Sequence, residues 1–376
     1  MRYCQHLLGL VKSGGVSMNL SVSSRVLQKK RYMATLAALS VGLLVGCSKP
    51  ADDAANATSA ASPETAKSIV VYSSRNEQLI QPLLTQFTEQ TGVQVKLITD
   101  KEGPLMARLK AEGQNSPADL LLTVDAGNLW QAGQEGLLQA VESTTLTENI
   151  PAYLRDPANQ WFGLSIRART MLHNPDLVSA SELSTYEDLA DPKWKGKLCL
   201  RTSKKVYNQS LVAMLIDHHG EAKAEQIVKG WIANLATEVF PDDTKLIEAI
   251  AAGQCGVGIA NTYYYGRLEQ KDPAIKAKVF WANQADTGVH VNVSGAGVTR
   301  YAPNKAEAVQ LIEWLASEQA QQAYSNQDHE YPVLASVAVS PQLQAWGEFK
   351  QDPINVAKYG ELQTAAVKLM DRAGYK

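Results

Sequence analysis

From Ser68 onward, short apolar runs alternate with longer stretches in which apolar residues recur at helical spacing. Residues Ser68–Ser73 (SIVVYS) predict a strand, and the helix that follows should end at Gly92, since glycine commonly closes helices. The same alternation then predicts a strand at Val93–Ile98, a helix at Pro104–Glu112 and a second strand at Asp119–Val124. Asp125 is placed to cap the next helix. This pattern favours an α/β fold, with parallel strands covered by helices.

The second half of the chain repeats the alternation. The predicted strands are Lys197–Arg201, Gly256–Ala260 and Gly288–Thr299, and the predicted helices are Asn208–Ile216, Ala222–Ala233, Asp243–Ala252 and Lys305–Ala323. Such a chain can fold as two similar lobes. In open parallel sheets, ligands bind at the carboxyl ends of the strands. The residues just after each strand are therefore the candidates for a binding site.

Length and charge narrow the class of protein. The chain has 376 residues, which exceeds one average domain and leaves room for two lobes. Its formal net charge is -2, but residues 1–46 hold six basic residues and no acidic one, so the remainder has 30 basic against 38 acidic residues, a net charge of -8. Because phosphate contacts need clustered Lys and Arg, an acidic body without a basic patch argues against a nucleic acid as partner.

Residues 1–46 have the pattern of an export signal. Basic residues within positions 25–31 precede the apolar run Met33–Val45, which is too short to span a bilayer comfortably. A signal that starts at Met18 is more typical than one that starts at Met1. Leu44-Val45-Gly46-Cys47 resembles the bacterial lipobox, which implies that Cys47 receives a lipid; a plain signal peptide with an incidental cysteine is the alternative. Residues 47–67, rich in Ala, Ser, Thr and Asp, predict a flexible tether between this lipid anchor and the folded body.

If Cys47 carries a lipid, Cys199 and Cys255 are the cysteines that remain in the mature body. Disulfides form and persist in exported proteins. Both cysteines lie near predicted strands in the same half of the chain, so a bridge between them is feasible. Two separately buried thiols are the alternative.

Three consecutive tyrosines follow the strand Gly256–Ala260, in the run Asn261-Thr262-Tyr263-Tyr264-Tyr265. Neighbouring side chains of a regular strand point to opposite faces. Two of these phenols reach one ligand only if the backbone leaves extended geometry, so we expect a turn or a helix start at Tyr263. The alternative is that the tyrosines pack at a sheet edge with their hydroxyls in water.

The order of these segments resembles the ferric-ion-binding periplasmic proteins of ATP-binding-cassette (ABC) importers, within the type II solute-binding fold. The matching segments are VYSSRNEQLIQPLLTQFTEQTGVQVKL, SPADLLLTVDAGNLW, WFGLSIRARTMLHNPD, DPKWKGKLCLRTSKKVYNQSL, DDTKLIEAIAAGQ, GIANTYYYGRL, SGAGV and EYPV. The resemblance implies two lobes, each a mixed, mostly parallel sheet flanked by helices, with the ligand cleft between them. It divides the chain into one lobe of residues 68–165 and 288–335 and another of residues 166–287 and 336–376. Hinges are expected near residues 148–166 and 284–292.

By that resemblance, Tyr263 and Tyr264 would bind the metal, and Tyr207 in VYNQS matches a third phenolate ligand. Arg167 in SIRAR matches an arginine beside the metal or its synergistic anion, for which carbonate is a candidate. Many members carry a histidine just after the first strand, whereas this chain has Asn76 followed by Glu77, the candidate fourth ligand. The residues expected to hold the anion or to surround the ligands are Arg167, Arg75, Ser74, Asn76, Ser203, Asn261 and Tyr265.

The chemistry of such a site suits Fe³⁺, a small and highly charged cation that favours anionic oxygen over sulfur or imidazole. A monomeric, periplasmic carrier that hands Fe³⁺ to an ABC permease and ATPase complex is therefore the predicted function. The alternative within the fold is an organic solute, such as a polyamine, thiamine or a sugar phosphate, stacked on the tyrosines. The sequence contains no GxSxG, HExxH or P-loop motif that would favour an enzyme.

Overall fold

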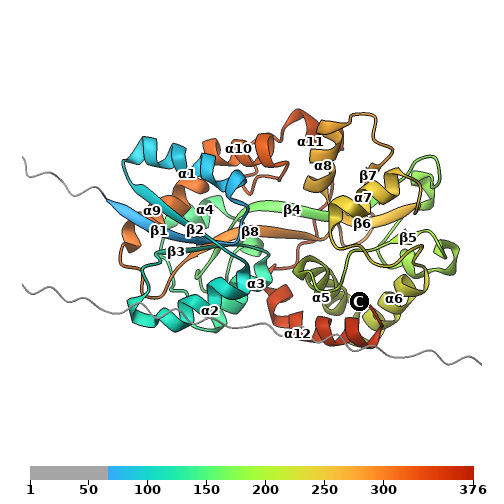
Figure 1. The fold of residues 1–376 in the computed structure, drawn as a ribbon, viewed down its shortest axis with the longest axis horizontal. Coiled ribbons are helices and arrows are strands. Elements are labelled where there is room, and N and C mark those ends of the chain that lie inside the picture. The colour runs from blue at the N-terminus through green and yellow to red at the C-terminus, as the bar shows by residue number, and fades with distance from the viewer. Residues whose placement is uncertain (1–66) are drawn as a thin grey trace, which may run out of the picture. The chain divides into compact units, whose positions relative to one another are not determined.

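The structure is a computed structural model that describes residues 67–376 (Figure 1). The predicted signal peptide and lipobox, and the predicted tether except Lys67, lie outside the described residues. Within residues 67–376, no helix combines the length and the apolar character that crossing a membrane requires.

Eight strands share one sheet in the order β2-β1-β3-β8-β4-β6-β5, and β7 pairs with β4 beside this path. The strands are β1 (Ser68–Ser73), β2 (Gln94–Thr99), β3 (Leu120–Val124), β4 (Phe162–His173), β5 (Leu198–Cys199), β6 (Val257–Asn261), β7 (Lys278–Phe280) and β8 (Val291–Val298). The strand predicted at Lys197–Arg201 is thus shorter than expected. β4 was not predicted, although it is the longest strand and is buried throughout.

Strand β4 links the two parts of this sheet. Its first part, Phe162–Ala168, pairs antiparallel with β8, and Arg169–His173 pairs antiparallel with β6. β1, β2, β3 and β4 run in one direction with β8 against them, while β5, β6 and β7 run together against β4. Both parts are therefore mixed, as predicted, but they are not mostly parallel, because four of the seven strand pairs are antiparallel. In Figure 1, β4 and β8 run lengthwise through the middle of the fold.

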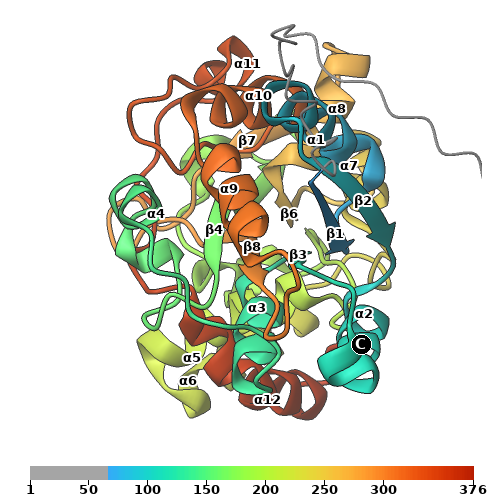
Figure 2. The same cartoon turned by 90° about the vertical axis from the view of Figure 1, so that its left-hand side faces the viewer.

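The helices cover both faces of the sheet. They are α1 (Glu77–Thr91), α2 (Glu102–Glu112), α3 (Ala126–Gln134), α4 (Thr144–Asn149), α5 (Val206–His219), α6 (Glu221–Ala233), α7 (Asp243–Ala251), α8 (Thr262–Lys271), α9 (Lys305–Leu315), α10 (Glu318–Asp328), α11 (Pro341–Ala345) and α12 (Ala357–Arg372). On the part around β1 and β3, α1 and α10 lie on one side and α2 and α3 on the other (Figures 1 and 2). On the part around β6, α7 and α8 lie opposite α5, α6 and α12.

Local signals explain most helix ends. The helix predicted to close at Gly92 does so, because this glycine adopts the left-handed φ of 75° that ends α1. Asp125 caps α3 as predicted, since its carboxylate accepts a hydrogen bond from the Gly127 N–H. The single helix predicted over Lys305–Ala323 is wrong. Ser317 begins a new helix there, because its hydroxyl accepts from the Ala320 N–H, and the stretch is split into α9 and α10.

Helix α12 packs against α5 on one side and α3 on the other. Gly360 of α12 makes the second contact possible, because a Cβ at this position would lie 2.5 Å from the Cβ of Trp130 in α3. The C-terminal helix therefore joins elements from both parts of the sheet.

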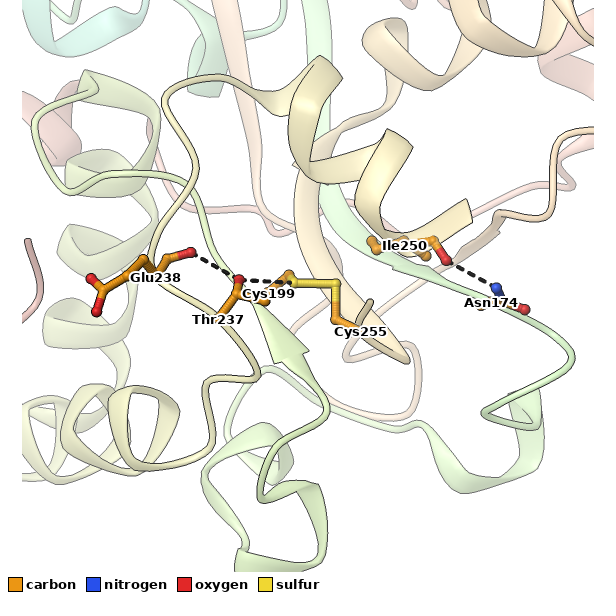
Figure 3. Close-up of a disulfide and its surroundings, with 6 residues drawn as sticks. All are labelled: Asn174, Cys199, Thr237, Glu238, Ile250 and Cys255. Carbon is orange, nitrogen blue, oxygen red and sulfur yellow. Dashed lines mark hydrogen bonds between the residues drawn. A yellow bond between two sulfur atoms is a disulfide. The ribbon is translucent and has the colours of Figure 1, made fainter. Parts of the chain in front are cut away.

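Cys199 and Cys255, whose pairing the sequence left open, form a disulfide with a Cα–Cα distance of 5.9 Å (Figure 3). Both cysteines are buried, and the Thr237 hydroxyl lies 3.8 Å from the Cys199 sulfur. The bridge joins β5 to the residue that comes two positions before β6.

Candidate metal centre

Residues from both parts of the sheet meet in one pocket with a volume of about 280 Å³. One side comes from the loop after β1, the start of α1 and α2 and the end of β3; the other comes from the first turns of α5 and α8, and β4 supplies the floor. The lining residues are Ser74, Arg75, Asn76, Leu79, Glu102, Val124, Arg167, Lys205, Tyr207, Tyr263, Tyr264, Arg267 and Glu330. The three tyrosines predicted to bind the metal thus share one pocket with Arg167.

The tyrosines are placed by two helices that follow neighbouring parallel strands, α5 after β5 and α8 after β6. Tyr207 is the second residue of α5, and Tyr263 and Tyr264 are the second and third residues of α8. The predicted break from extended geometry before Tyr263 is confirmed, because α8 begins at Thr262. The Tyr263 hydroxyl donates to the Tyr207 hydroxyl over 3.4 Å, and the rings of Tyr263 and Tyr264 lie 4.3 Å apart. Three phenol groups therefore gather within a few ångströms.

Cationic side chains surround these phenols. The Arg167 guanidinium donates to the Tyr207 hydroxyl over 3.3 Å and to the Val293 carbonyl over 3.1 Å. The Lys205 ammonium lies 4.6 Å from the centre of the Tyr207 ring. The N-termini of α5 and α8 add partial positive charge at the same place. These positive charges favour negative charge on the Tyr207 oxygen.

The three phenols differ in acidity. Burial alone would raise the pKa of Tyr207, but the charges of Arg167 and Lys205 hold it below its usual value. Burial raises the pKa of Tyr263 and that of Tyr264, and a charge on Tyr207 raises both further. Tyr207 is therefore the first phenol to ionise. Its two neighbours stay protonated at neutral pH unless a cation enters the pocket.

A buried charge cluster fixes Arg75 at the edge of the pocket. Its guanidinium pairs with Asp328 at 2.5 Å and with Glu330 at 3.0 Å, and it donates to the Ser294 hydroxyl over 2.7 Å. The Ser165 hydroxyl donates to Glu330. Burial alone would raise the pKa of Glu330, but the charges of Arg75 and Arg167 hold it below its usual value. Glu330 is therefore ionised and belongs to the pocket.

Sequence reasoning missed Glu330 as a site residue. The segment EYPV that contains it was one of those that carried the resemblance, but nothing around it in the sequence indicated Arg75 as its partner. The two residues are 255 positions apart, and only the fold brings them together.

The other predicted site residues divide into two groups. Ser74 and Asn76 line the pocket, and the Ser74 hydroxyl is paired with that of Thr123 at 2.8 Å. The remaining four are not among the lining residues: Glu77, Ser203, Asn261 and Tyr265. Glu77 is exposed at the start of α1, whereas Tyr265 is buried and donates from its hydroxyl to Glu269. The structure therefore does not bring Glu77 to the tyrosines.

Asn261 belongs to a polar network centred on Arg169. The Arg169 guanidinium donates to Asn261 over 3.1 Å, to Asn208 over 2.6 Å and to Asp243 over 3.2 Å. Asn208 follows Tyr207 directly, and Asn261 precedes α8. The network therefore holds the starts of the two tyrosine-bearing helices against each other.

The donor set of the pocket is oxygen, from phenols and carboxylates. Within residues 67–376, no group of three His, Cys, Asp or Glu side chains comes together in a manner that could hold a metal. Phenol oxygens that ionise beside a cation suit a small, highly charged metal ion, because such an ion favours anionic oxygen.

Comparison with known proteins agrees with this chemistry. Residues 83–351 match the model of the bacterial extracellular solute-binding protein family. The chain is 45% identical over 340 residues to "Iron uptake protein A1" of Synechocystis sp., a match that covers 89% of this chain and 93% of the relative. It is 27% identical over 312 residues to the "Fe(3+)-binding periplasmic protein" of Serratia marcescens, which covers 81% of this chain and 90% of that one.

Solved structures are similar over the same region. The Trichodesmium protein IdiA (FutA), in complex with iron and citrate, is 48% identical with a TM-score of 0.79, covering 82% of this chain and all of that one. The ferric-ion-binding protein A of Mannheimia haemolytica, in an open conformation, is 39% identical with a TM-score of 0.77, covering 82% of this chain and 99% of that one. The two-lobed type II solute-binding fold predicted from the sequence is thereby confirmed. The chain belongs to the bacterial extracellular solute-binding protein family.

Proposed function

We infer that this protein binds ferric iron in the periplasm through the phenolates of Tyr207, Tyr263 and Tyr264 and delivers it to an ABC importer. The observation that carries the proposal is that three tyrosines from two helix N-termini line one pocket beside Arg167, with the hydroxyls of Tyr207 and Tyr263 3.4 Å apart. Relatives that are named for iron uptake and ferric iron binding support it.

The proposed ligands suit Fe³⁺ because phenolate is a hard, anionic oxygen donor. A free phenol ionises near pH 10, so a neutral solution supplies few phenolates without a cation. Arg167 and Lys205 favour the Tyr207 phenolate, and the field of Fe³⁺ would remove the protons of Tyr263 and Tyr264. Binding therefore releases protons and weakens in acid.

The charge balance of the pocket favours an anion beside the iron. The lining carries four cationic side chains, Arg75, Arg167, Lys205 and Arg267, against the carboxylates of Glu102 and Glu330. Three phenolates would balance Fe³⁺, so this positive surplus would remain. Asp328, just outside the lining, pairs with Arg75 and reduces the surplus without removing it. An anion such as carbonate beside the iron, held mainly by Arg167, would offset this surplus.

We place the cleft between a lobe of residues 68–165 and 288–335 and a lobe of residues 166–287 and 336–376. Lys205 and Glu102 face each other across the pocket at 3.7 Å, one from each proposed lobe. Rotation of the lobes would separate this pair and expose the iron for release to the permease and its ATPase. The carrier acts as a monomer, anchored to the membrane by a lipid on Cys47.

The proposal is tested by colour and metal content. Purified protein mixed with chelated Fe³⁺ should bind iron and show a visible phenolate-to-iron charge-transfer band. Tyr263→Phe or Tyr264→Phe should abolish the band, and Tyr207→Phe should weaken iron binding. Tyr72→Phe is the matched control, because this buried tyrosine donates to Glu112 away from the pocket.

Unchanged iron binding in all three pocket variants would overturn the assignment of the ligands. Wild-type protein that binds no iron and shows no band would instead favour an organic solute. The four cationic lining residues argue against a polyamine and would suit an anionic ligand such as a sugar phosphate.

A further inference from the structure

The strand pair that carries the tyrosines is short. β5 is two residues long and pairs with β6 at only two positions, Leu198 with Val257 and Cys199 with Gly258. β6 pairs with β4 on its other side at five positions. β6 is therefore fixed firmly in the sheet. The pairing between β5 and β6 is weak by comparison, although residues 234–240 form hydrogen bonds with the other edge of β5 and the residues that follow it.

The disulfide strengthens this weak pairing. It joins Cys199 of β5 to Cys255, two residues before β6, and both sulfur-bearing side chains are buried (Figure 3). Gly256 and Val257, which directly follow Cys255, donate backbone hydrogen bonds to the Lys197 carbonyl. The bridge therefore joins the last residue of β5 to the residue two positions before β6, and it restrains the two strands against sliding along each other.

The positions of the tyrosines repeat the spacing of the cysteines. Tyr207 follows Cys199 by eight residues, and Tyr263 follows Cys255 by eight residues. Both tyrosines are the second residue of the helix that follows their strand. We call the segments 199–207 and 255–263 the two arms. They have the same length, and they are joined by the disulfide at one end and by the hydroxyl pair of Tyr207 and Tyr263 at the other.

We propose that the Cys199–Cys255 disulfide is a positioning element for the metal centre: it fixes the register of the two arms and thereby sets the spacing of the Tyr207 and Tyr263 oxygens. The proposal rests on the function proposed above. Near the tyrosines, Arg169 joins the arms by hydrogen bonds to Asn208 and Asn261, and the Asn208 amide donates to the Arg201 carbonyl over 2.9 Å. These hydrogen bonds hold the arms near the tyrosines, and the disulfide holds them at the other end. A shift of β5 along β6 would move Tyr207 relative to Tyr263.

A metal centre is sensitive to such a shift, because ligand distances must be held to about 0.2 Å. Residues that orient ligands without touching the metal typically change affinity by about 10- to 100-fold when they are lost. A disulfide that only stabilised the fold would leave the bound complex unchanged at temperatures where the protein stays folded. Affinity and spectrum therefore separate positioning from stability.

The test uses the full chain with Cys199→Ala and Cys255→Ala together, at a temperature at which circular dichroism shows that the variant is folded. Iron binding is measured by competition with citrate, and the charge-transfer band is recorded. We expect binding to weaken about 10-fold or more, with a shifted or broadened band. A second pair, Cys199→Val with Cys255→Ala, fills more of the vacated volume and serves the same comparison if the first pair does not fold.

Val228→Ala is the control for lost stability, because Val228 is buried in α6, is not one of the residues paired between β5 and β6, and does not line the pocket. It should melt earlier than wild type but bind iron with the same affinity and band. Double variants that match wild type in both affinity and band would overturn the positioning role and leave the proposed function intact. Wild-type protein without a band would refute the proposed function itself.

Discussion

Replacement of Glu330 by glutamine tests how the pocket holds its arginines. The Glu330 carboxylate accepts from Arg75 at 3.0 Å and from the Ser165 hydroxyl, and the side chains of Glu330 and Arg75 are each 2% exposed. Glutamine keeps the shape and one acceptor oxygen but removes the charge. Arg75 would then retain only Asp328 as an anionic partner among the residues that the structure places around it.

The expected loss follows from the cost of breaking a buried ion pair, about 3–5 kcal/mol when one partner is removed. Because Asp328 remains and the amide oxygen still accepts one hydrogen bond, we expect a loss near the lower end, about 3 kcal/mol of unfolding free energy. The pocket also gains positive charge, so iron binding should weaken in the same variant.

Urea unfolding at pH 7, followed by tryptophan fluorescence, measures this loss. Glu248→Gln is the matched control, because Glu248 pairs with Lys245 on the surface, where both side chains are largely exposed, and its loss should not change stability measurably. A loss of less than about 1 kcal/mol for Glu330→Gln would show that the cluster does not depend on this charge.

Three further outcomes are expected. Burial raises the pKa of Asp328 to about 6 despite Arg75, so the folded state holds this proton more tightly than the unfolded state does, and the resulting stability is lost as pH rises from about 4 through about 6. Urea unfolding across this pH range should show that Asp328→Asn removes the decline in unfolding free energy. Parallel curves of unfolding free energy against pH for variant and wild type would contradict this prediction. Removal of the disulfide should lower the unfolding free energy by about 4 kcal/mol in the same assay, because the bridge closes a loop between cysteines 56 positions apart. An unchanged urea midpoint would contradict this prediction. Cys47→Ala should release the protein from the membrane fraction on cell fractionation, and continued retention would refute lipid attachment.

The sequence was sufficient for the elements whose signals are local. The apolar run at Ser68–Ser73 became β1, the glycine at position 92 ends α1, and Asp125 caps α3. The start of α8 was predicted because two phenols cannot reach one ligand from a regular strand. Each of these conclusions depends on a few neighbouring residues, so no tertiary contact was needed to reach them.

The features that the sequence did not reveal depend on contacts between distant residues. β4 carries Arg167 and Arg169 within a completely buried strand. Apolar and polar residues alternate over 164–169, which is the pattern of a half-buried strand, so the sequence does not reveal that both faces of β4 are buried. Both arginines are tolerated there because partners from other elements satisfy them: Tyr207 for Arg167, and Asp243 for Arg169. The ion pairs of Arg75 and the pairing of the two cysteines likewise join residues that are far apart in the sequence.

Anomalous diffraction from a crystal of the iron-loaded protein locates the metal. We expect one iron peak in the pocket, within bonding distance of the phenol oxygens of Tyr207, Tyr263 and Tyr264, with Arg167 beside it. An iron peak elsewhere, or a peak in the pocket with the three phenols turned away from it, would refute the proposed ligand set.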